Sequence, residues 1–124
     1  MAFHYHSVII EFYSWLLFFF CTDKPSAPRN VRPVEVDAAY ITIAWDAPAS
    51  DGGSPVIGFV VEKKDSRRGE YMFVGHVDSS TTQLKATRLF EGTDYMFRVF
   101  AENAAGLSSP CETERPITAR LPFG

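Results

Sequence analysis

The sequence predicts an all-β domain built as an antiparallel, two-sheet sandwich of seven strands. Short alternating runs recur at spacings near ten residues, separated by clusters of Gly, Pro, Asp and Ser. In the clearest run, Tyr95, Phe97 and Val99 alternate with Met96 and Arg98, which is the period of two of a half-buried strand. From residue 24 onward no segment shows a helical period.

The start of this strand carries a second signature of a sandwich. Tyr95 directly follows the turn formed by residues 91–94, and Leu89 lies six residues before it. This spacing is typical of a tyrosine corner, in which the ring packs inward and the hydroxyl bonds to backbone a few residues upstream. The tyrosine corner therefore favours a binding or spacing module over an enzyme.

The first two strands follow from proline positions and alternation. Pro25, Pro28 and Pro33 keep the first segment extended and confine it to a sheet edge, because proline has no N–H to give to a ladder. Residues 40–45 then alternate as a second strand.

The third and fourth strands form a predicted hairpin. Residues 51–55 are turn formers and lead into a third strand at 56–64. Gly69 lies in the turn before a fourth strand at 71–77.

The last predicted strands are shorter. Residues 82–86 form one before the tyrosine corner, and after a turn at 104–106 the final strand runs over 110–117. The predicted core consists of the inward-facing side chains Ile41, Ile43, Trp45, Phe59, Val61, Leu84, Leu89, Tyr95, Phe97, Val99 and Ala101.

Composition changes abruptly near residue 23 and predicts three parts. Residues 1–23 form an apolar N-terminal extension outside the sandwich, residues 24–119 form the sandwich domain, and residues 120–124 form a C-terminal linker. The sandwich domain is long enough to fold without disulfide bonds.

The N-terminal extension has three open interpretations. Residues 8–21 are nearly all apolar but include Glu11, and the run is shorter than the roughly 20 residues of a membrane-spanning helix. It also lacks the basic start and small-residue cleavage site of a signal peptide. The segment is a leader or anchor, a real structured element, or a gene-model artefact in which a polypyrimidine tract at an intron–exon junction is translated.

The net charge and the cysteine content limit the class of partner and the compartment that we expect. The chain of 124 residues has a net charge of −3, which argues against nucleic acid because phosphates need a basic field. Cys21 and Cys111 are the only cysteines, and Cys21 lies outside the predicted sandwich. A disulfide framework is therefore not expected, and two cysteines that form no disulfide are typical of a reducing compartment.

No pattern of residues indicates catalysis, a cofactor or a metal. His4, His6 and Cys21 match no closed zinc spacing. Residues 51–53 are glycine-rich, but they lack the lysine and the following helix that hold a phosphate. We therefore expect no catalytic, cofactor-binding or metal-ligating residues and no small-molecule substrate.

Several motifs together resemble a known family. They are Pro-Ser-Ala-Pro at 25–28, Ile-Ala-Trp at 43–45, Asp-Gly-Gly-Ser-Pro at 51–55, Gly-Phe-Val-Val-Glu-Lys at 58–63, and Phe-Arg-Val-x-Ala-Glu-Asn-x-x-Gly at 97–106. With the tyrosine corner, they make residues 24–119 similar to a fibronectin type III domain, which implies an immunoglobulin-like sandwich. Phe59, where tyrosine is commoner, and Cys111 depart from the family pattern.

The residues in these motifs resemble those of the giant muscle proteins titin, twitchin and projectin, and more distantly those of myosin-binding protein C. That resemblance implies a non-catalytic spacer and docking module of a cytoplasmic, sarcomeric protein. Its implied partners are thick-filament myosin or adjacent immunoglobulin and fibronectin type III modules, with no membrane contact. The alternative is a module of a cell-surface receptor or adhesion ectodomain, with residues 1–22 as its leader.

One surface is a candidate for partner contact. If the strand after the tyrosine corner turns Tyr95 inward, then Met96, Arg98 and Phe100 face outward, and Val60 joins them from the third strand. Exposed apolar groups around a charge form a contact patch for myosin or an adjacent module. The alternative is ordinary cross-strand packing, partly covered by Tyr71 and Phe73.

Overall fold

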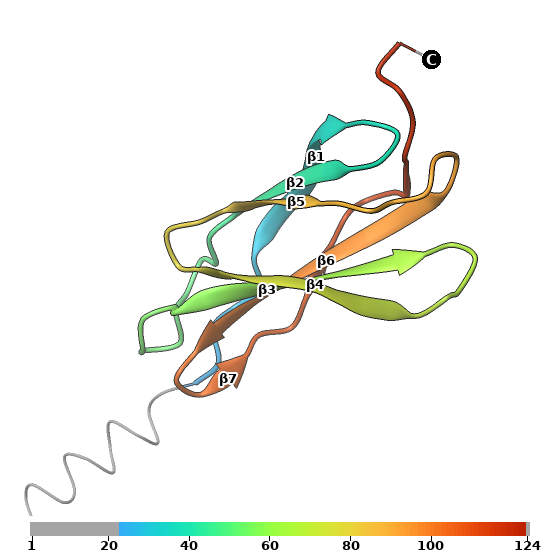
Figure 1. The fold of residues 1–124 in the computed structure, drawn as a ribbon. Coiled ribbons are helices and arrows are strands. Elements are labelled where there is room, and N and C mark those ends of the chain that lie inside the picture. The colour runs from blue at the N-terminus through green and yellow to red at the C-terminus, as the bar shows by residue number, and fades with distance from the viewer. Residues whose placement is uncertain (1–22, 124) are drawn as a thin grey trace, which may run out of the picture.

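The computed structural model describes residues 23–123, which form two antiparallel sheets stacked face to face, with no helix in this range (Figure 1). The first sheet has the order β1 (Arg29–Val36), β2 (Ile41–Asp46), β5 (Gln83–Ala86). The second has the order β4 (Tyr71–Asp78), β3 (Gly58–Asp65), β6 (Asp94–Asn103), β7 (Gly106–Leu107). Two further short strands, β8 (Cys111–Glu112) and β9 (Ile117–Thr118), also pair with β6. The all-β sandwich expected from the sequence is confirmed. Of the predicted extension over residues 1–23, residues 1–22 lie outside the described residues.

The final strand differs from the prediction of one run over 110–117. It consists of three short pieces, β7, β8 and β9, because two hydroxyls take the place of backbone carbonyls. The Ala101 N–H donates to Ser108 Oγ at 2.9 Å, and the Ser108 N–H donates to the Ala101 carbonyl at 2.8 Å. Phe97 and Thr113 make the same reciprocal pair at 3.3 and 2.9 Å. The strand therefore stays attached to β6 where the regular ladder is interrupted.

The core lies between the two sheets and is filled by the alternating side chains. Trp45 from β2 meets Phe59 from β3 edge-to-face, with ring centroids 5.5 Å apart. β6 is paired with β3 along one side and with the three final pieces along the other. The buried residues that were expected in the core are Ile41, Ile43, Trp45, Phe59, Val61, Leu89, Tyr95, Phe97, Val99 and Ala101.

Leu84 is the exception, because it is only partly buried. β5 is one of the two edge strands of the smaller sheet, so its side chains have protein on fewer sides. Leu84 reaches across to Gly75 of β4, where an added Cβ would lie 2.9 Å from its Cδ1 atom. The side chain therefore covers the open edge between the sheets instead of filling their centre.

The tyrosine corner predicted from the sequence is present. Tyr95 is 2% exposed, and its hydroxyl accepts a hydrogen bond from the Phe90 N–H at 2.8 Å. The turn is also held by the exiting chain, since the Gly92 N–H donates to the Ala119 carbonyl at 2.7 Å. The corner thus fixes where β6 begins and where the chain leaves the sandwich.

Replacing Tyr95 by Phe tests the corner. The ring stays, but the Phe90 N–H loses its acceptor in a part-buried position, so we expect a loss of about 1–2 kcal/mol in the free energy of unfolding. Equilibrium denaturation of the variant and of the parent chain measures it. An unchanged free energy of unfolding would show that this hydrogen bond contributes nothing net.

Candidate protein-contact surfaces

The outer face of the larger sheet brings the four predicted contact residues together. In the register of β3 against β6, Val60 lies opposite Phe100, and Lys64 lies opposite Met96. Arg98 lies between these two pairs, opposite Glu62. Val60, Met96, Arg98 and Phe100 are all half-buried. We call this set the outer-face patch.

Arg98 is the organising side chain of the outer-face patch. Its Nη2 and Nε atoms lie 2.6 and 2.7 Å from Glu62 Oε1. Its guanidinium carbon lies 3.9 Å from the ring centroid of Tyr71 and 5.1 Å from that of Phe100. The charge is therefore paired with a carboxylate and packed between two aromatic rings, which holds the side chain in one position.

Tyr71 covers one side of this cluster, as the packing alternative expected. The Tyr71 hydroxyl is buried and has no hydrogen-bond partner within residues 23–123. Burial raises the pKa of Tyr71, and the nearby Glu112 carboxylate raises it further, so the phenol stays neutral. Phe73, in contrast, is 65% exposed. The outer face thus combines an ordered centre with an exposed aromatic ring beside it.

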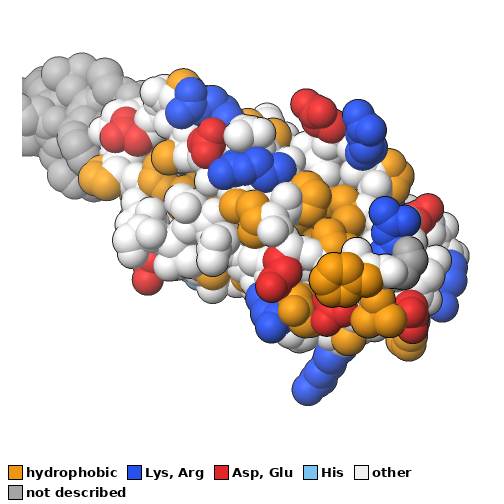
Figure 2. Space-filling model, turned by 90° about the horizontal axis from the view of Figure 1, so that it is seen from above, with side chains coloured by type: hydrophobic (Ala, Val, Ile, Leu, Met, Phe, Trp, Pro, Cys, Tyr) orange, Lys and Arg blue, Asp and Glu red, His pale blue; other side chains and the backbone are white. Residues whose placement is uncertain are grey.

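A second apolar surface lies at the end where the chain leaves the sandwich. Phe90, Leu121 and Phe123 are exposed there, and Arg67 lies over the Phe90 ring at 4.8 Å. Figure 2 views the molecule from above Figure 1 and shows hydrophobic side chains gathered among acidic and basic ones on the right-hand part of the surface.

At the opposite end, Asn103 ties the incoming chain to a loop. Its Nδ2 atom donates to the carbonyls of Asp23 and Asp51 at 2.6 and 2.7 Å, and its Oδ1 atom accepts from the Ala105 N–H at 2.8 Å. Asn103 is 2% exposed. No local sequence pattern indicates this role, because the bonded groups are 80 and 52 residues away in the chain.

Gly52 completes the same connection. The Asp23 N–H donates to the Gly52 carbonyl at 2.8 Å. The Gly52 φ is +78°, and an added Cβ would lie 2.2 Å from the Asp23 carbonyl oxygen. The loop therefore needs glycine both for its backbone conformation and for the close approach of the incoming chain.

The described part of the chain offers no metal centre. Between residues 23 and 123, no group of three or more His, Cys, Asp or Glu side chains is placed to hold a metal ion. His76 lies 3.1 Å from Glu102 on the outer face, and His4, His6 and Cys21 fall outside the described range. In the same range, no helix is long and apolar enough to cross a membrane.

Known proteins share this architecture. The family model of the fibronectin type III domain matches residues 26–117. The chain is 33% identical over 100 residues to fast-type myosin-binding protein C of Gallus gallus, a match that covers 81% of this chain and 9% of that protein. It is 38% identical over 90 residues to titin of Drosophila melanogaster, covering 73% of this chain and a share of titin that rounds to 0%.

A solved structure has the same fold. The twitchin kinase region from C. elegans matches with a TM-score of 0.74 at 30% identity, covering 79% of this chain and 17% of that one. The described residues thus define an immunoglobulin-like sandwich with a tyrosine corner. The chain belongs to the fibronectin type III family, and it is similar to modules of titin, twitchin and myosin-binding protein C.

Replacing Asn103 by Ala tests the connection to the incoming chain. The carbonyls of Asp23 and Asp51 lose their donor, and we expect a loss of about 1–3 kcal/mol in the free energy of unfolding. Faster hydrogen exchange at the Asp23 amide is expected with it.

The matched variant is Asn103→Asp, which keeps the shape and the acceptor for Ala105 but removes both donors. We expect it to be destabilised at least as much as the alanine variant, because a carboxylate then faces two carbonyls. Aspartate restoring the stability of the parent chain would contradict the assignment of the donors.

Proposed function

We propose that this chain is a non-catalytic structural and protein-binding module of a cytoplasmic, sarcomeric protein of the titin and twitchin kind. The similarity to modules of titin, twitchin and myosin-binding protein C supports the class of parent protein. The opposite positions of the incoming and outgoing chain support a role as a spacer, because load then passes along the length of the sandwich (Figure 1).

Myosin is the partner that we propose for the outer-face patch, and an adjacent module is the alternative. The name of myosin-binding protein C supports this choice of partner. The observation that carries the docking role is the fixed Arg98, held by Glu62 and flanked by Tyr71 and Phe100. An arginine and aromatic rings held rigidly at a surface are the side chains that dominate protein interfaces, because little conformational entropy is lost when they bind.

Phe100→Ser separates docking from simple packing. Phe100 is half-buried on the outer face, and its loss is expected to weaken binding to purified myosin about tenfold or more while the melting temperature changes little. Co-sedimentation with myosin filaments measures binding, and thermal denaturation followed by circular dichroism measures stability.

The matched control is Phe90→Ser, which makes the same chemical change at the end of the sandwich. Phe90 is 59% exposed and lies outside the outer-face patch, so this variant is expected to bind myosin like the parent chain. A lower melting temperature for Phe100→Ser with unchanged affinity of the folded fraction would support cross-strand packing instead. An equal loss of myosin affinity in the two variants would show that the contact does not lie on the outer-face patch.

A further inference from the structure

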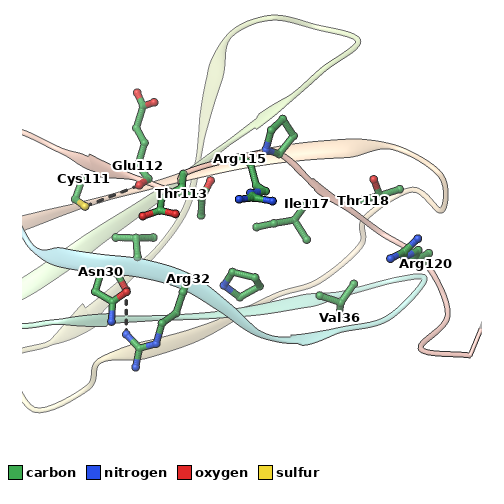
Figure 3. Close-up of a pocket in the computed structure, with 14 residues that line it drawn as sticks. Asn30, Arg32, Val36, Cys111, Glu112, Thr113, Arg115, Ile117, Thr118 and Arg120 are labelled. Atoms are coloured by element: carbon green, nitrogen blue, oxygen red, sulfur yellow. Dashed lines mark hydrogen bonds between the residues drawn. The ribbon is translucent and has the colours of Figure 1, made fainter.

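A groove runs along the side of the sandwich where the edges of the two sheets face each other. One wall is β1, the edge strand of the smaller sheet on the side opposite β5, and the other wall is the chain from β8 to β9 on the larger sheet (Figure 3). The cavity between them has a volume of about 670 Å³. It is separate from the outer-face patch, none of whose residues line it.

The floor of the groove is apolar and incompletely covered. Val36, Cys111 and Ile117 pack against the hydrophobic core but remain partly exposed, and all three line the groove. Along β1 the lining extends from Asn30 to Val36, which is about 20 Å of extended chain at roughly 3.3 Å per residue. This length suits a peptide of six to eight residues in an extended conformation.

The rim of the groove carries positive charge without a partner. Arg115 and Arg120 are exposed, and within residues 23–123 neither guanidinium has a carboxylate within 4.0 Å or a hydrogen bond. Figure 3 shows both side chains beside the groove, whereas Glu112 points away from β1. Glu114 is the remaining acidic residue of the lining.

Arg32 contributes less, because it is already engaged. Its Nη1 atom donates to the Asn30 carbonyl at 2.9 Å and lies 3.4 Å from Asp46 Oδ1. With Arg32 paired and Glu112 turned away, the two charges of Arg115 and Arg120 exceed the single carboxylate of Glu114, so the groove keeps a net positive charge that is complementary to carboxylates.

The backbone of both walls limits how a ligand can bind. Pro33 in β1 and Pro116 between β8 and β9 have no N–H, so neither wall can offer an unbroken ladder to an added strand. An extended ligand would therefore be held mainly by its side chains, with apolar groups on the floor and charged groups at the rim.

We propose that this groove binds an extended, acidic peptide segment of another protein. Alternate side chains of the segment are apolar and pack on Val36, Cys111 and Ile117, and the intervening carboxylates pair with Arg115 and Arg120. The proposal does not depend on myosin binding by the outer-face patch.

The test uses the 124-residue chain and an eight-residue, end-capped peptide that alternates Glu and Val, with a Lys and Val peptide as the charge control. Chemical-shift mapping by NMR is expected to show the acidic peptide at the groove and no effect of the basic one. Arg115→Glu and Arg120→Glu are each expected to weaken binding about tenfold, whereas Arg68→Glu, on the β3–β4 turn outside the groove lining, leaves it unchanged.

A second readout follows the floor directly. Alkylation of Cys111 by iodoacetamide, located by mass spectrometry so that Cys21 is counted separately, is expected to slow when the acidic peptide is bound. Absence of shifts at the groove at millimolar peptide would overturn the proposal, and so would equal weakening by Arg68→Glu. Inorganic phosphate giving the same shifts, with no protection of Cys111, would show a small-anion site and overturn the peptide assignment.

Discussion

The packing of Trp45 against Phe59 and the inward face of β6 is the interaction on which the rest of this structure depends. Only side chains at every second position of β6 reach the core, and their neighbours are placed on the outer face by the same pleat. The alternation of side chains along β6 therefore determines both the core and the outer-face patch. A slip of one residue in the register of β6 would expose the core residues and bury Arg98.

Three buried polar side chains connect this central strand to the rest of the chain. Ser108 and Thr113 pair with the backbone of β6 through their hydroxyls, and Asn103 at its end binds two distant carbonyls. The two hydroxyls satisfy β6 amides that the short pieces β7, β8 and β9 would otherwise leave unpaired, and Asn103 satisfies the carbonyls of Asp23 and Asp51. The Trp45 indole N–H, in contrast, is buried without a partner in the described range, so its ring contributes through packing alone.

The fold could be predicted from the sequence because alternation and turn residues are local signals. The inward positions of β2, β3 and β6 and the hydrogen bond of Tyr95 follow from spacing alone. Leu84 was placed too deep, because alternation gives the direction of a side chain and not how much protein covers an edge strand. The broken final strand and the role of Asn103 depend on partners that lie far away in the chain, which no local pattern records.

The contact surfaces could be predicted only in part. Alternation placed Val60, Met96, Arg98 and Phe100 on one face, but the stacking of Tyr71 on Arg98 depends on the register of β4 against β3, which includes an irregularity after Val61. The groove could not be predicted, since it arises where the edges of two different sheets face each other. Its lining comes from chain segments about 80 residues apart.

Native-state hydrogen exchange of the β6 amides tests the central claim most directly. A strand paired on both sides and buried on its inner face should open only when the whole sandwich unfolds. We therefore expect the amides of Phe97, Val99 and Ala101 to be among the slowest to exchange, with a free energy of opening equal to that of global unfolding. Exchange of these amides as fast as in the exposed turns would contradict the account.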